Sequence, residues 1–531
     1  MGTLWFGGPI YTLQEEGHKV EAVLTEGDKI LQIGSKEELE TNYKEFIHLR
    51  RDLEGSTLLP GFVDSHMHLI GHGERLIRLN LSHFTSKDEL LEAVKAYSKQ
   101  FKPGEWIIGE GWNENLWDNP EPVNKDDLDR VAPEHPVILK RICRHAIAVN
   151  SLAMQRASIH RNTDCPDGGV IEKDKQGNPV GIFKEQAQEL ILSVVPEVSE
   201  DYLKVAMQAA IKDAHRLGLT GGHTEDLNYY GGFWKTYNTF INVIEEEPLR
   251  FRAHLLVHHE VSEDFKGAGG EFLKGNEWIE FGAFKAFADG ALGGRTALLS
   301  HPYADDPSTN GVAIYSQEQL NDIVLKARKM NMPVAIHTIG DLAFDMALQA
   351  IEENPLQGSG RDRLIHAQIL RKDLIERAKN LPLILDIQPS FVASDFPWVI
   401  ERIGHENMTY CYAWKTLLGE NIPCAGGSDA PIESLDPLLG IYTAVTRSKV
   451  DGEEIYNANE ALSVYEAVSL FTKGSAYAAC HEHDRGEVKP GYFADFTILK
   501  QNIFSVPYNE IHLIEVDKTV VGGEIVYEKN Q

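Results

Sequence analysis

The feature that most constrains the fold is a set of short apolar runs along the middle of the chain, with amphipathic helix patterns between them. We count eight runs: 57–64, 217–223, 251–257, 279–287, 333–337, 363–366, 383–388 and 423–428. Short apolar runs that alternate with helices are typical of buried parallel strands. Eight is the strand number that a (β/α)₈ barrel requires. The sequence therefore predicts an α/β protein whose main body is a TIM-type barrel.

The spacing of the runs predicts two additions to this barrel. Far more residues than one helix needs separate the first run from the second, so we expect a large insertion after strand 1, at about 70–215. Both ends of the chain consist of short strand patterns and turns. We therefore assign 57–484 to the barrel, and 1–56 together with 485–531 to a small composite β-sandwich built from both termini.

Composition excludes several classes of protein. The 531 residues include 51 Lys and Arg against 80 Asp and Glu, a formal net charge of −29, so nucleic acid is not an expected partner. Five cysteines without a C-x-x-C pair argue against a disulfide framework and favour a reducing compartment. We see neither a signal-peptide pattern nor an apolar run long enough to span a membrane. The expectation is a cytoplasmic protein that acts on a small molecule, with no membrane partner.

The strongest local motif is Pro-Gly-Phe-Val-Asp-Ser-His-Met-His at 60–68. Because residues two apart on a strand face the same side, Asp64, His66 and His68 point together. They lie at the carboxyl end of the first apolar run, and that end is the functional face of a barrel. Two adjacent imidazoles can chelate a metal such as zinc. An H-x-H pair alone, however, is common by chance.

Other strand ends strengthen this prediction. Two further runs end at His337 and His366, and Asp429 directly follows the eighth run. A single histidine at a strand end is ordinarily a hydrogen-bonded structural residue. Independent structural explanations for all three residues, together with His66 and His68, are much harder to sustain. The pattern therefore predicts a metal centre at the carboxyl end of the barrel.

Lys285 lies on the fourth run with its side chain on the inward face. A buried lysine beside histidines and a metal is costly as an ammonium ion. As a neutral amine it can react with carbon dioxide to form a carbamate, whose two oxygens can bridge two cations. The alternative is an ion pair with Asp289 or Asp429. Lys184 is a rival lysine, but it lies in the insertion and on none of the eight runs.

These residues make the chain resemble the amidohydrolase superfamily of metal-dependent hydrolases. That pattern has H-x-H on the first strand, a carboxylated lysine on the fourth, histidines on the fifth and sixth, and an aspartate on the eighth. The resemblance covers nearly the whole chain, since 26–30 and 485–495 resemble the superfamily's composite β-sandwich. Within the superfamily the chain is most similar to the branch that contains N-substituted formamide deformylase. The motifs behind this similarity are at 111–112, 144–146, 149–151, 289–297 and 337–341.

The resemblance implies hydrolysis of a C–N bond, in an amide, formamide or related group, by a metal-activated hydroxide. One or two divalent metals, zinc by first choice, would be held by six residues: His66, His68, Lys285, His337, His366 and Asp429. Asp429 and a bridging, carboxylated Lys285 would be the catalytic residues, with Asp429 passing a proton to the leaving amine.

Four further residues are weaker candidates for substrate contact. Asp289 and Arg295 follow the fourth strand, and His145 and Trp112 lie in the insertion. Arg295 suits a carbonyl or carboxylate, or equally a structural ion pair. Trp112 also suits the core of the insertion.

Histidines near two other strand ends are not predicted to bind metal directly. His223 ends the second run and is expected beside the metal ligands, whereas His258 and His259 follow the third run and are expected to contact solvent. Two alternatives to the hydrolase stay open: a metal-dependent lyase or isomerase on the same barrel, and a catalytically silent binding or assembly protein. A homodimer is the base-rate expectation for the oligomeric state.

Overall fold

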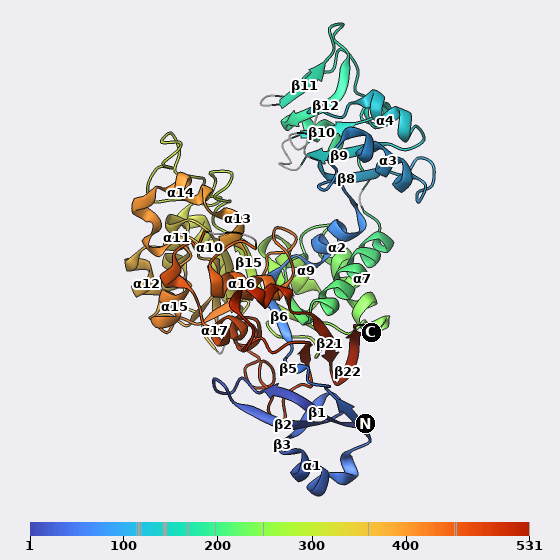
Figure 1. Cartoon of the computed structure of the whole chain (residues 1–531). Coiled ribbons are helices and arrows are strands. Elements are labelled where there is room, and N and C mark those ends of the chain that lie inside the picture. Colours follow the sequence, from blue (N-terminus) through green and yellow to red (C-terminus); the bar gives the residue numbers. More distant parts are fainter. Residues whose placement is uncertain are drawn as a thin grey trace. The chain divides into compact units, whose positions relative to one another are not determined.

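The computed structural model describes residues 1–112, 114, 117, 119–141, 146–166, 169–196, 198–247, 249–358, 360–450, 452 and 454–529 (Figure 1). The chain forms two compact units. The first comprises Met1–His72 and Glu200–Gln531, and the second comprises Gly73–Ser199. Within the described ranges, no helix is both long and apolar enough to cross a membrane.

The first unit contains the predicted barrel. Its eight strands are hydrogen-bonded in the order β19-β18-β17-β16-β15-β14-β13-β6, and each neighbouring pair in this order is parallel. Between β19 and β6, the Asp429 N–H donates to the His66 carbonyl at 2.7 Å. The α/β barrel prediction is thereby confirmed. The strands are β6 (Phe62–Met67), β13 (Leu219–Thr224), β14 (Arg252–His258), β15 (Ile279–Phe287), β16 (Val334–Thr338), β17 (Asp362–His366), β18 (Leu383–Ile387) and β19 (Cys424–Gly426).

Helices between these strands bury one apolar face each, as their periodicity predicts. The helix α10 starts at a capping box in which Ser316 and Gln319 bond each other's backbone N–H. The helices of this unit are α1 (Lys36–Asn42), α7 (Glu200–Arg216), α8 (Phe233–Phe240), α9 (Ser262–Gly267), α10 (Gln317–Lys329), α11 (Asp341–Glu353), α12 (Lys372–Ala378), α13 (Phe391–Asp395), α14 (Trp398–Ile403), α15 (Trp414–Gly419), α16 (Pro437–Thr446), α17 (Val464–Ser469) and α18 (Ser475–Ala478).

The predicted first strand, 57–64, proves to be two strands in two sheets. β5 (Thr57–Pro60) belongs to the terminal sheet, and β6 belongs to the barrel. The chain changes sheets at Gly61, whose N–H donates to the Asp495 carbonyl at 2.8 Å. A Cβ at Gly61 would lie 2.5 Å from the Thr220 side chain, so the close approach requires glycine. The apolar run continues through the break because both strands are buried.

Strands from both ends of the chain form the terminal sheet, in the order β22-β21-β20-β5-β1-β2-β3, with β4 paired to β1. β1 shifts register between Phe6 and Ile10, pairing with β4 before the shift and β5 after it. Trp5, Phe496 and Val520 lie in its core. The remaining strands are β1 (Gly2–Tyr11), β2 (Lys19–Glu26), β3 (Lys29–Gly34), β4 (Leu49–Asp52), β20 (Phe496–Leu499), β21 (Val516–Val521) and β22 (Glu524–Glu528).

The second unit has its own sheet, ordered β11-β12-β10-β9-β8-β7. The predicted insertion, about 70–215, extends past this unit at its C-terminal end. The reason is α7, an amphipathic helix of the first unit that buries Leu203, Met207 and Ala210 and leads into β13. The elements after His72 are β7 (Leu79–Asn80), α3 (Lys87–Ser98), β8 (Ile107–Trp112), α4 (Lys125–Val131), β9 (Val137–Arg141), β10 (Ala146–Val149), α5 (Ser151–Arg156), β11 (Gly169–Lys173), β12 (Pro179–Glu185) and α6 (Glu189–Leu192); α2 (Leu69–Ile77) spans the boundary.

Candidate metal centre

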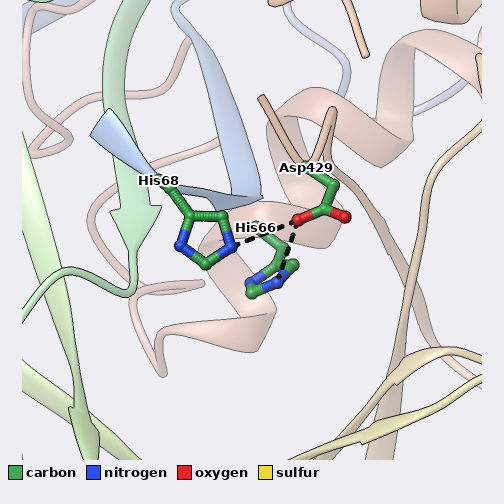
Figure 2. A group of neighbouring side chains, drawn as sticks. All are labelled: His66, His68 and Asp429. Carbon is green, nitrogen blue, oxygen red and sulfur yellow. Dashed lines mark ion pairs between the residues drawn. The ribbon is translucent and has the colours of Figure 1, made fainter. Parts of the chain in front are cut away.

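Three side chains converge at the carboxyl ends of β6 and β19. His66 Nε2 and His68 Nε2 lie 3.5 and 3.4 Å from the same oxygen, Oδ1 of Asp429 (Figure 2). One ligand atom from each residue lies within 4.8 Å of those of the other two. Two imidazole nitrogens and a carboxylate oxygen at this spacing fit a divalent metal ion.

The other predicted ligands lie beside this group. Lys285 is fully buried, and its Nζ is 3.3 Å from His66 Nε2. The His366 ring centroid lies 5.7 Å from that of His66 and 4.4 Å from that of His337. The structure therefore brings the six predicted metal ligands together at the carboxyl ends of five strands. Lys184, the rival lysine, lies on β12 in the second unit, where it pairs with a carboxylate at 2.5 Å.

Hydrogen bonds determine which nitrogen of two ligand rings is left for a cation. His68 Nδ1 lies 2.7 Å from the Glu225 backbone carbonyl, which can only accept, so this nitrogen carries the proton. His366 Nδ1 lies 2.7 Å from Gln388 Oε1, and Gln388 Nε2 donates in turn to a backbone carbonyl at 3.1 Å. Nε2 of His366 therefore keeps a lone pair, and Nε2 of His68 is the nitrogen that faces Asp429. Such outer partners orient metal-binding histidines.

His337 has the opposite orientation. Its Nε2 lies 3.0 Å from the Gly290 carbonyl and must donate to it, so Nδ1 keeps the lone pair. The ring also packs against Phe287, with centroids 5.2 Å apart. The three histidines are thus positioned by partners that a cation would not displace.

Burial and charge set the protonation of the cluster. Burial lowers the pKa of Lys285, although the Glu225 and Asp429 carboxylates oppose this. Burial also lowers the pKa of His66 well below its ordinary value. For Asp429, burial favours the neutral acid, but the His68 hydrogen bond and nearby positive charges outweigh it and lower the pKa. The same contact overcomes burial at His68 and raises its pKa to about 9. An ionised carboxylate and a neutral His66 are the forms that metal binding requires.

The Asp289 carboxylate holds two loop segments together through hydrogen bonds to their backbone. Its Oδ2 accepts the N–H groups of Leu298 and Gly340 at 2.9 and 2.8 Å, and its Oδ1 accepts that of Ile339 at 3.0 Å. These bonds tie the segment after β15 to the segment after β16. The side chain is buried, and burial raises its pKa to about 7 against the three N–H donors. The contacts favour loop positioning over substrate binding.

The observed contacts of Arg295 and Trp112 give each of these predicted substrate contacts a structural role. Arg295 forms a bidentate ion pair with Asp305, at 3.1 and 2.8 Å, and Arg402 pairs with the same carboxylate. Trp112 is buried in the apolar core of the second unit. His145 lies outside the described residues.

A second polar cluster lies among β14, β15 and the segment after α18. Glu280 accepts from His254 Nδ1 and His481 Nε2, both at 2.9 Å, and Arg485 lies 3.8 Å away. His481 Nδ1 also contacts Asp484 at 3.0 Å. Burial opposes ionisation of Glu280, but the two histidines outweigh it and lower the pKa. This cluster joins the barrel to the C-terminal segment.

Burial contradicts the expectation for one of the three histidines near the ends of β13 and β14. His258 is only 6 % exposed, so the expectation of solvent contact was wrong for it, whereas His259 is partly buried and bonds Tyr315 OH at 2.8 Å. His223 faces His254, with ring centroids 4.7 Å apart, in a cavity also lined by His481. The signal for His258 was present in the period-2 alternation of β14 after His254.

Comparison with known proteins identifies the family of the chain. The model of the Amidohydrolase family matches residues 51–527. The chain is 52% identical over 532 residues to amidohydrolase YtcJ of Bacillus subtilis (strain 168), covering 100% of both chains. It is 24% identical over 540 residues to N-substituted formamide deformylase of Arthrobacter pascens, covering 98% of this chain and 97% of that one.

A solved structure is also similar. The crystal structure of an uncharacterized metal-dependent hydrolase from Pyrococcus horikoshii OT3 matches with a TM-score of 0.82 and 29% identity, over 96% of this chain and 99% of that one. Together with the family match, this similarity supports a metal-dependent hydrolase and confirms the resemblance drawn from the strand-end residues. The chain belongs to the amidohydrolase family.

Proposed function

We propose that this chain hydrolyses a C–N bond in a small amide, formamide or related molecule. The observation that carries the proposal is the shared Asp429 Oδ1, 3.5 and 3.4 Å from the inward nitrogens of His66 and His68. The relative named N-substituted formamide deformylase supports the choice of bond. The lyase, isomerase and silent-protein alternatives have no observation of their own in their favour.

The donor set suits one or two divalent cations, with zinc as first choice. His66, His68 and Asp429 would hold one, and His337 and His366 a second. A carboxylated Lys285, fully buried with its pKa lowered, would bridge the two. A bound divalent cation supplies Lewis-acid polarisation of a carbonyl and lowers the pKa of water to about 7.

The chain's own residues then move the proton. Asp429 is ionised and lies at the centre of the donor group, so it can accept a proton from the attacking water and deliver it to the leaving nitrogen. The bond from His68 Nδ1 to the Glu225 carbonyl fixes the His68 ring during this transfer. Asp289 is assigned to loop positioning rather than to substrate.

The test is metal content per chain by plasma mass spectrometry, on protein purified without chelator and with bicarbonate present. Wild type, Lys285→Ala and Lys184→Ala are compared, because Lys184 is a partly exposed lysine of the second unit. We expect a bridged pair of metals in wild type and in Lys184→Ala, at most one in Lys285→Ala, and hydrolysis of a panel of neutral amides and formamides by wild type.

Each other outcome selects an alternative. Equal metal content in all three proteins would remove Lys285 from the centre of the site. No metal after reconstitution would refute the proposed chemistry, and bound metal without hydrolysis would favour the silent protein. A carbon–carbon cleavage product in stoichiometric yield would favour a lyase. A cytoplasmic location, a small-molecule substrate and a homodimer stay predictions.

A further inference from the structure

Three ring side chains line one side of the metal cluster, and we call Tyr229, His258 and Phe287 the ring wall. The Tyr229 centroid lies 6.2 Å from His68 and 6.3 Å from His258. The Phe287 centroid lies 5.9 Å from His258 and 5.2 Å from His337. The ring wall therefore runs from one side of the cluster to the other, with His258 in its middle.

The strands place His258 at the level of the reacting groups. In the parallel pairing of β14 with β15, His258 lies opposite Lys285. Neighbouring positions on parallel barrel strands at the same level share a face. His258 is buried, and its surroundings are the two flanking rings and His259. The imidazole is thus held inside the mouth of the barrel beside the metal cluster.

The hydrogen bond on the other side of the ring fixes the tautomer of His258. Nδ1 accepts the backbone N–H of Glu260 at 3.3 Å, capping the short turn that follows β14. The Glu260 carboxylate is exposed and lies 3.8 Å from Nδ1, beyond hydrogen-bond range. A ring that accepts this N–H keeps its lone pair on Nδ1 and carries its proton on Nε2.

That Nε2–H has no hydrogen-bond partner among the residues that the structure describes. The hydroxyl of Tyr229 is already donated to Glu225 Oε2 at 3.0 Å, and Phe287 has no polar atom. The ring wall therefore offers one N–H donor for a ligand. The ring is only 6 % exposed, so its flanking rings partly shield this donor from water, and a hydrogen bond in such surroundings is stronger than one in bulk water.

We propose that His258 is a catalytic residue that donates its Nε2–H to the carbonyl oxygen of the scissile amide. This inference rests on the proposed C–N hydrolysis. Water adds to the carbonyl carbon, the C–N bond breaks, and a proton from water leaves with the amine by way of Asp429. His258 exchanges no proton. It stabilises the negative charge that grows on the oxygen, and a fixed donor of this kind contributes about 10²–10³ in kcat.

The test compares His258→Phe, which keeps a ring but has no donor, with His258→Gln, whose amide restores an N–H near the position of Nε2. His259→Gln is the matched control, because His259 is the adjacent imidazole and bonds Tyr315 OH. The readouts are kcat and KM for formanilide, a neutral N-aryl formamide, and metal content per chain.

We expect His258→Phe to lower kcat by about 10²–10³. KM should rise no more than about tenfold, because the loss of one ordinary hydrogen bond to the bound substrate weakens binding by no more than that. The metal content should not change. His258→Gln should recover at least about tenfold of the lost kcat, and His259→Gln should stay near wild type. A kcat for His258→Phe within about threefold of wild type, or a loss of metal that accounts for the loss of rate, overturns the proposal.

Two further arms keep the outcomes distinct. If His258→Phe does not fold, as judged by circular dichroism, His258→Gln and His258→Asn replace it, and the longer Gln must be the faster enzyme. If wild type binds metal but cleaves no amide, the proposed function fails by itself. His258 is then tested by calorimetric binding of formanilide, where equal affinities for wild type and His258→Phe overturn the proposal.

Discussion

The ion pair between Arg363 of β17 and Asp386 of β18 shows how the barrel core supports the metal cluster. Arg363 Nε and Nη2 lie 2.8 and 3.1 Å from the two carboxylate oxygens, and Nη2 also donates to the Ser65 carbonyl at 2.5 Å. The two side chains are 1 % and 0 % exposed. Arg363 therefore ties three strands together. Its partner Ser65 directly precedes His66, and Arg363 itself lies three residues before His366.

The distances give the size of the effect. At 2.8 Å and an effective dielectric constant of about 20, the attraction is about 6 kcal/mol. Burying the two ions costs several kcal/mol each, so the intact pair contributes little net stability. Removing one partner leaves the other charge buried and unpaired. Arg363→Met should therefore lower the free energy of unfolding by about 3–5 kcal/mol, and Arg363→Met with Asp386→Leu should recover most of that loss.

The assay is a double-mutant cycle on metal-free protein, with unfolding followed by calorimetry and by urea titration. The cycle should give a large favourable coupling between the two positions. Metal affinity is a second readout, because the bond to the Ser65 carbonyl positions the strand that carries His66. A loss below about 1 kcal/mol for Arg363→Met, or a double variant as unstable as the sum of the singles, would refute the reasoning.

Three other predictions follow from single contacts. Interaction with Glu280 and Asp484 raises the pKa of His481 above its ordinary 6.5 in spite of burial, so the stability it contributes is present below pH 6.5 and is lost as pH rises through the folded pKa. His481→Gln should therefore lower the melting temperature more at pH 6 than at pH 9; equal losses would contradict this. Asp289→Asn turns one acceptor into a donor that faces backbone N–H groups, so it should lower the free energy of unfolding by about 1–3 kcal/mol. Thermal unfolding measures this loss, and an unchanged melting temperature would show that the Asp289 carboxylate does not hold the two segments together. Trp112→Ala should cost the second unit about 3–5 kcal/mol, seen as faster hydrogen exchange within 73–199 at unchanged metal content, and slow exchange throughout would show that Trp112 is not core.

Much of the site was predictable because two simple rules place it. Period-2 alternation sets which residues of a strand face inward, and barrel strands present their functional residues at the carboxyl end. These rules place His66, Lys285 and Asp429 without knowledge of any contact. They also predict the strands, although an apolar run that crosses from β5 to β6 cannot reveal the change of sheet at Gly61.

The residues that sequence reasoning missed depend on pairing and on backbone atoms. His258 shares one face of β14 with His254, but its burial depends on the rings of Tyr229 and Phe287, which other segments contribute. Glu225 orients His68 through its carbonyl oxygen, a group that every residue has. The sequence allows Arg295 either to bind substrate or to form a structural ion pair. Which of the two occurs depends on the position of Asp305, which a loop determines.

The positions of these partners indicate that the metal cluster is set before a cation arrives. The carbonyl of Glu225 and the side chain of Gln388 hold His68 and His366 from outside the cluster, so ring orientation does not depend on metal. A cation that binds these rings therefore needs no reorganisation of the fold. Its binding energy then goes mainly into stabilising the native state, as linkage requires for a ligand that binds only folded protein.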